Sequence, residues 1–159
     1  MPRSCACTAL GLAANGAIPV GAYSDRHSGG AGILGSLTIA SNEDAVIGIR
    51  LDGSTTRIAG RRLSSEVVPS YNITSVTANV VATMSSEYLK PYAVLGGGWY
   101  SYRDSVSTDK RQNRAGLQGG VGVTFPFILS SGFLEVRYHR IFQSDVQKRY
   151  IGLSAGLLL

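Results

Sequence analysis

The chain has 159 residues, of which 16 % are charged and 20 are glycine, and its formal net charge is +5. A soluble domain averages about 25 % charged residues, and no apolar run here approaches the ~18 residues that a membrane-spanning helix requires. Low charge without long apolar runs is typical of membrane strands, in which only every second residue faces lipid. The composition therefore argues against membrane-spanning helices and favours a β-rich membrane protein.

Residues alternate between apolar and polar or small types in eight segments separated by turn-rich stretches, and this period of two predicts strands. In chain order the predicted strands are 12–20, 32–40, 45–53, 73–84, 90–102, 114–125, 133–142 and 150–159. The third is the clearest, with Ile47, Ile49 and Leu51 on one face and Arg50 and Asp52 on the other. The pattern predicts an all-β fold, an eight-stranded antiparallel up-and-down transmembrane β-barrel.

The connections after the first, third, fifth and seventh strands are long or charged, whereas the other three are short. Outer-membrane barrels have this asymmetry, with short periplasmic turns and longer external loops. The long connections are rich in basic residues, among them Arg61, Arg62, Lys110 and Arg111. Since cationic side chains attract anionic headgroups, these four are predicted to contact lipopolysaccharide. Ordinary solvated loop charge is the alternative.

The polar faces of the predicted strands carry charges of both signs. If the aliphatic faces meet lipid, six polar residues point into the lumen: Arg50, Asp52, Gln118, Glu135, Arg137 and His139. An interior formed by eight strands is just wide enough for its own side chains, and buried charges must be paired. We therefore expect a salt-bridged plug that fills the lumen, with a gated pore as the alternative.

The fifth predicted strand is apolar for most of its length but has three consecutive glycines, Gly96, Gly97 and Gly98, and tyrosines near both ends. Aromatic residues form girdles at both membrane interfaces of such barrels. Five residues are predicted to belong to the girdles: Tyr92, Tyr100, Tyr102, Phe125 and Tyr138. Trp99 is then expected to point inward with Leu95, into space that the glycines leave.

Five segments carry a further signal: GAIPVGAYSD (16–25), ANVV (78–81), KPYAVLGGGWY (90–100), FLEVRYH (133–139) and the closing YIGLSAGLLL (150–159). In their order and spacing they resemble the bacterial outer-membrane β-barrel family of eight-stranded proteins similar to the OmpA transmembrane domain. The resemblance implies a porin-family barrel in the outer membrane, both termini in the periplasm, and usually no enzymatic activity. It also implies the β-barrel assembly machinery as a partner during biogenesis, although the family favours an aromatic last residue and this chain ends at Leu159.

Three other functions were weighed against a structural or surface-interaction role. A lipid-modifying enzyme needs a base beside a nucleophile; His27 lies near Ser28 and Asp25, and His139 lies near Glu135, but neither group forms a recognisable motif. A soluble lipocalin-like barrel would place apolar residues inside and polar residues outside. A small pore is the third. We expect no catalysis, no cofactor, no nucleic-acid binding, and a monomer.

The N-terminal residues 1–11 are expected to be a tail, with the signal peptide either reduced to a remnant or missing, and the barrel is expected to occupy 12–159. The only cysteines, Cys5 and Cys7, lie in this tail. Two cysteines without nearby histidine do not make a convincing metal site, so no metal is expected.

Overall fold

The structure of the protein, a computed structural model, describes residues 7–40, 46–60, 62–63, 66–84, 86, 88–104, 112–142 and 148–159. Eight long strands dominate it: β1 Cys7–Pro19, β2 His27–Ala40, β3 Ile47–Gly60, β6 Tyr71–Thr83, β7 Lys90–Asp104, β8 Gln112–Phe127, β9 Ser130–Ile141 and β10 Lys148–Leu158. A single 3-10 turn, η1 Gly21–Tyr23, follows β1, and two short strands, β4 Arg62–Leu63 and β5 Glu66–Val67, pair with each other after β3. No helix in the described residues is long and apolar enough to cross a membrane.

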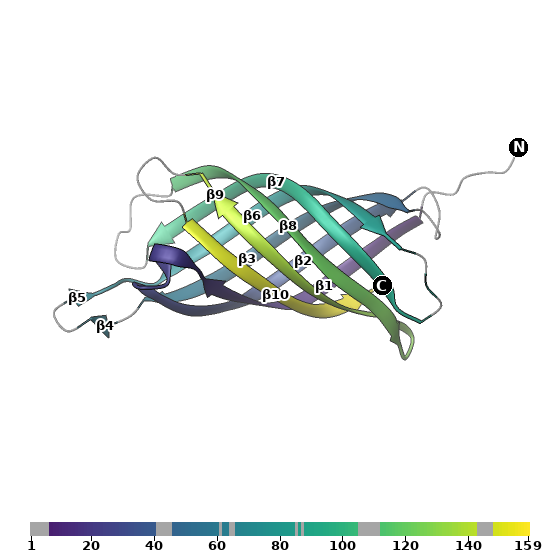
Figure 1. Ribbon diagram of the computed structural model, residues 1–159, viewed down its shortest axis with the longest axis horizontal. Helices are drawn as coiled ribbons and strands as arrows, with labels where there is room; N and C mark the ends of the chain where they lie inside the picture. Colours follow the sequence, from purple (N-terminus) through teal and green to yellow (C-terminus); the bar gives the residue numbers. More distant parts are fainter. Residues whose placement is uncertain are drawn as a thin grey trace, which may run out of the picture.

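The eight long strands close into one antiparallel barrel in the order β1-β10-β9-β8-β7-β6-β3-β2 (Figure 1). Every strand pairs with its neighbours in sequence, and the barrel closes where β1 pairs with β10 along Gly11 to Pro19. Closure removes the exposed edges that an open sheet would present. The predicted fold class, an eight-stranded up-and-down barrel, is confirmed.

The strand register fixes the tilt of the strands. A row of paired residues that starts at Arg57 on β3 passes through Ala31, Gly16 and Leu153 and continues around the barrel to Ile47, again on β3. The row therefore returns ten residues earlier on the strand from which it left. A shear of this size in eight strands gives a tilt of about 40° and an interior that side chains can fill.

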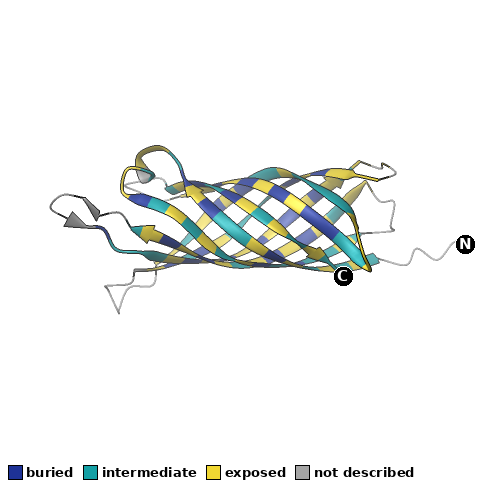
Figure 2. Ribbon diagram, turned by 90° about the horizontal axis from the view of Figure 1, so that it is seen from below, coloured by how far each residue is buried: buried dark blue, intermediate teal, exposed yellow. Residues whose placement is uncertain are grey.

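Buried and exposed residues alternate along most of the barrel wall (Figure 2). On β6, for example, Ser75, Thr77 and Asn79 are buried while Val76 and Val80 are more than half exposed. Around the buried charges in the middle of the barrel the outer surface is largely aliphatic, which is the reverse of a soluble barrel. The period of two that the sequence predicts therefore corresponds to inward and outward positions in the barrel wall.

The strands are longer than the sequence predicts, chiefly at the end of the barrel with the loops. β2 begins at His27, inside the expected polar connection, and β3 continues to Gly60 instead of ending at Gly53. β1 begins at Cys7, so the expected boundary between a tail and a barrel at residue 12 is wrong, and 7–11 belong to the wall. These polar or small residues do not alternate as a strand would, but they become part of a strand because they pair with β10 and β2.

We call the end that carries the connections β1–β2, β3–β6, β7–β8 and β9–β10 the loop end, and the opposite end the turn end. Because the strands extend toward the loop end, the contrast between long and short connections is smaller than expected. Among the connections between the eight long strands, the β8–β9 turn at Ile128 and Leu129 is the shortest, with two residues. Ile128 there adopts a positive φ of 48°, which a branched residue tolerates only in a tight turn.

Candidate functional site: the lumen and the outer wall

Four charged residues join opposite walls of the barrel in a closed ring. Arg50 and Asp52 lie on β3, Glu135 and Arg137 lie on β9, and all four are buried. Arg50 Nη2 donates to Glu135 Oε2 at 2.6 Å, and Arg137 Nη1 donates to Asp52 Oδ2 at 2.6 Å. Each arginine also pairs with the acid on its own strand, Arg50 Nε with Asp52 Oδ1 at 3.2 Å and Arg137 Nε with Glu135 Oε1. Two charges of each sign cancel, so the plug has no net charge.

Neutral polar side chains extend the network on both sides of the four charges. Tyr92 Oη donates to Glu135 Oε2 at 2.8 Å, and Asn79 Nδ2 donates to Asp52 Oδ2 at 2.9 Å. Gln118 Nε2 donates to Asn79 Oδ1 at 2.6 Å and to Thr77 Oγ1 at 2.8 Å. A buried network in which the members bond one another holds a single arrangement of the surrounding wall.

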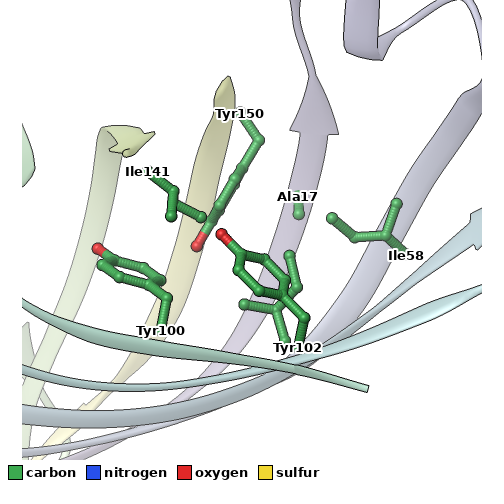
Figure 3. Packing of buried hydrophobic residues seen from close by; sticks show 7 residues of the cluster. Ala17, Ile58, Tyr100, Tyr102, Ile141 and Tyr150 are labelled. Atoms are coloured by element: carbon green, nitrogen blue, oxygen red, sulfur yellow. The ribbon is translucent and has the colours of Figure 1, made fainter. Parts of the chain in front are cut away.

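An apolar cluster closes the lumen above this network (Figure 3). Its seven members come from six strands: Ala17, Ile58, Ile73, Tyr100, Tyr102, Ile141 and Tyr150. The Tyr100 hydroxyl lies 3.1 Å from His139 Nδ1, and the His139 ring stacks on Tyr150 with centroids 4.3 Å apart, so the cluster is joined to the polar network. At the loop end Lys148 Nζ lies 4.2 Å from the Tyr102 ring and 4.7 Å from the Tyr71 ring. Cation–π contacts of this kind hold the lysine over the cluster.

Little space remains inside the middle of the barrel. One hollow of about 10 Å³ lies between Asn15, Asp52 and Arg137, and this is room for about one water molecule. Two of the polar atoms beside it, Asn15 Oδ1 and Arg137 Nη2, are buried without a hydrogen-bond partner in the protein. A single ordered water bonded to both would satisfy them, and it would not open a continuous path.

Outside, the wall has an apolar belt toward the turn end and a basic rim toward the loop end. On β7 the belt includes Leu95 and Trp99, which are 70 % and 68 % exposed. The eight residue steps from Pro91 to Trp99 cover about 20 Å along the barrel axis at a tilt of about 40°, close to the ~25 Å apolar band of membrane barrels. The basic rim consists of four outward-facing arginines: Arg57, Arg103, Arg140 and Arg149.

All six residues predicted for the lumen face inward and are buried. The prediction for β7 is wrong in its direction: Tyr92, Tyr100 and Tyr102 are buried in the lumen and do not form a girdle, and Trp99 and Leu95 face outward. The glycines do not make room for Trp99. Glycine at position 98 instead allows close approach of the neighbouring strand, because a Cβ there would collide with the backbone of Val76 and Thr77. In a strand of aromatic and small residues, the sequence pattern does not show which face points into the lumen. In the structure, the hydrogen bonds from Tyr92 to Glu135 and from Tyr100 to Gln118 hold the tyrosine face of β7 inward.

Of the predicted girdle, Phe125 and Tyr138 lie on the outer face, together with Trp99 and Phe142. The inward position of Tyr92 and the basic rim were not predicted from the sequence. Arg140 was detectable, because it continues the alternation of a well-predicted strand.

The residues predicted to contact lipopolysaccharide lie outside the described part of the chain, except for the backbone of Arg62 in β4. The candidate catalytic residues Ser28 and His27 contact neighbouring strands. Ser28 Oγ donates to the carbonyl of Ala59 at 3.2 Å, and the His27 ring lies against Tyr71 at 5.2 Å. Among the described residues no three His, Cys, Asp or Glu side chains gather as metal ligands would.

The fold is similar to those of several solved structures. Neisserial surface protein A has 16 % identity and a TM-score of 0.68, with 96 % of each chain covered. The N-terminal β-barrel domain of Pseudomonas aeruginosa OprF has 18 % identity and a TM-score of 0.55, covering 95 % of this chain and 97 % of its own. Yersinia pestis Ail in complex with the heparin analogue sucrose octasulfate has 21 % identity and a TM-score of 0.54, with 97 % of each chain covered. No protein-family model and no curated protein matches the chain.

These similarities extend over nearly the whole length of both chains, so the barrel as a whole corresponds to eight-stranded barrels such as the outer membrane protein Ail. The predicted resemblance to eight-stranded outer-membrane barrels is therefore confirmed at the level of the fold.

Proposed function

We propose that the protein is an integral β-barrel of a Gram-negative outer membrane with a structural or surface-interaction role and without transport or catalysis. One observation carries the proposal: an apolar wall about 20 Å high encloses a polar lumen whose charges are fully paired. The wall fits a bilayer, whereas a soluble barrel with Leu95 and Trp99 exposed would aggregate.

The filled lumen supports a closed barrel over a pore. A permeating ion would have to separate the Arg50–Glu135 and Arg137–Asp52 pairs and then pass the apolar cluster above them. Breaking one buried pair costs about 3–5 kcal/mol, and an apolar constriction also excludes water.

The basic loops suit an anionic partner at the cell surface. Contact between lipopolysaccharide and Arg61, Arg62, Lys110 and Arg111 remains part of this proposal. It is supported by the net charge of +5 and by the basic rim at the same end of the barrel. Replacing all four with glutamine should weaken binding to lipopolysaccharide in surface plasmon resonance, and unchanged affinity would contradict this part of the proposal.

Purification with and without detergent tests the membrane assignment. We expect the barrel to be monodisperse only in detergent or lipid and to show a heat-dependent shift in gel mobility. A monodisperse, folded protein without detergent would refute it. For the closed lumen, planar bilayers with purified protein should show conductance no greater than the protein-free background, and stable channel openings would favour the pore.

A further inference from the structure

Two hollows on the outer wall join into one groove. One, of about 410 Å³, lies over β1, β2, β9 and β10, and the other, of about 570 Å³, lies over β1, β2, β3 and β10. Both are lined by Gly16, Ala31 and Leu153, so they are continuous. The floor consists of small outward-facing residues, and Leu134, Val136 and Leu153 stand along one side.

The barrel wall has room for a larger side chain at position 16. A Cβ built there would meet no atom closer than 3.9 Å, unlike one at Gly98, which would collide with the backbone. The small side chains of Gly16 and Ala31 therefore create the groove, because larger residues would fit the strands and fill it. The neighbouring outward positions Leu12, Ile18 and Ile33 have such larger side chains.

The groove ends at Arg57. This arginine lines the upper hollow and is paired in register with Ala31, which is paired with Gly16. When the tilt of the strands is taken into account, Arg57 lies nearer the loop end than Gly16.

On the outer face of the eight barrel strands, the described residues include no acidic side chain that could pair with Arg57. An apolar channel that begins in the belt and ends at an arginine matches a molecule with an acyl chain and an anionic head. We propose that the groove binds one acyl chain of a phosphate-bearing lipid, with Arg57 bound to the phosphate. This site rests on the proposed location in a membrane, but it adds a defined lipid contact on the wall, separate from the predicted loop site.

Native mass spectrometry of the detergent-purified barrel tests the site, with two probe lipids of identical acyl chains. Phosphatidylglycerol supplies the phosphate and diacylglycerol lacks it. We expect one phosphatidylglycerol to remain bound, and diacylglycerol to bind more weakly. A charged hydrogen bond lost in Arg57→Gln should weaken phosphatidylglycerol binding about tenfold.

The matched control is Arg103→Gln, which removes an outward arginine from β7, away from the groove, and should leave binding unchanged. Ala31→Leu should fill the groove and remove binding while Arg57 is intact. Ala82→Leu, on the exposed face of β6, is the control for added bulk. Every variant is first checked for the heat-dependent gel shift that marks a folded barrel.

Equal binding of phosphatidylglycerol to folded Arg57→Gln and wild-type barrels would overturn the inference while leaving the membrane location intact. A dimer mass that Ala31→Leu abolishes would assign the groove to a second copy of the chain, and it would also overturn the inference. Failure of the wild-type protein to require detergent would instead refute the proposed function.

Discussion

Replacing Glu135 with glutamine tests whether the four lumen charges act as one unit. Glu135 is only 2 % exposed and accepts hydrogen bonds from Arg50, Arg137 and Tyr92. In Glu135→Gln two buried guanidinium groups share the single carboxylate of Asp52, and one positive charge is left uncompensated. Removing one partner of a buried ion pair costs about 3–5 kcal/mol, so the free energy of unfolding should fall by that amount.

Arg137→Gln should cost about as much, because it leaves a net negative charge. The double variant Glu135→Gln/Arg137→Gln is again neutral and keeps the Arg50–Asp52 pair, so its loss should be smaller than the sum of the single losses by about 1–3 kcal/mol. Urea unfolding from lipid vesicles, followed by the fluorescence of the lipid-facing Trp99, measures all three. Arg103→Gln, an exposed charge, should change stability by less than about 0.5 kcal/mol. Losses that add within about 0.5 kcal/mol would show that the charges act independently.

Further predictions concern single positions. Brominated lipids should strongly quench Trp99, which is 68 % exposed on the outer wall, and weak quenching would mean that β7 faces the other way. Gly98→Ala should destabilise the barrel by about 1–3 kcal/mol, because its Cβ would collide with the backbone of β6, whereas Gly53→Ala, with no atom within 4 Å, should be nearly neutral in the same urea titration. Lys148→Met should cost about 0.5–2 kcal/mol by removing the cation from the Tyr71 and Tyr102 rings, and an unchanged unfolding midpoint would show that the cation–π contacts do not stabilise the loop end.

The sequence predicted the strands and most of their faces because aliphatic residues have only one favourable side in this barrel. Ile47, Ile49 and Leu51 cannot enter a lumen that contains Arg50 and Asp52 without displacing charges into lipid. Tyrosine gives no such signal, since its ring is apolar and its hydroxyl can bond. The orientation of β7 therefore depends on partners such as Glu135 and Gln118, far away in the sequence. The ends of the strands were missed for a similar reason, because pairing with a neighbour extends β2 and β3 through polar residues.

The inner and outer faces of the barrel wall exchange polarity between the level of the four buried charges and the level of Arg57. Toward the turn end, lipid-facing aliphatic residues surround the buried charges of Arg50, Asp52, Glu135 and Arg137. At the level of Arg57 the outer face is basic, and the inner face carries the apolar cluster around Ile58. Adjacent residues on one strand, Arg57 and Ile58, thus face opposite environments. A shift of β3 by one residue would place Arg57 in the apolar cluster and Arg50 in lipid at the same time. The two levels together therefore fix the register of the strand more firmly than either level alone.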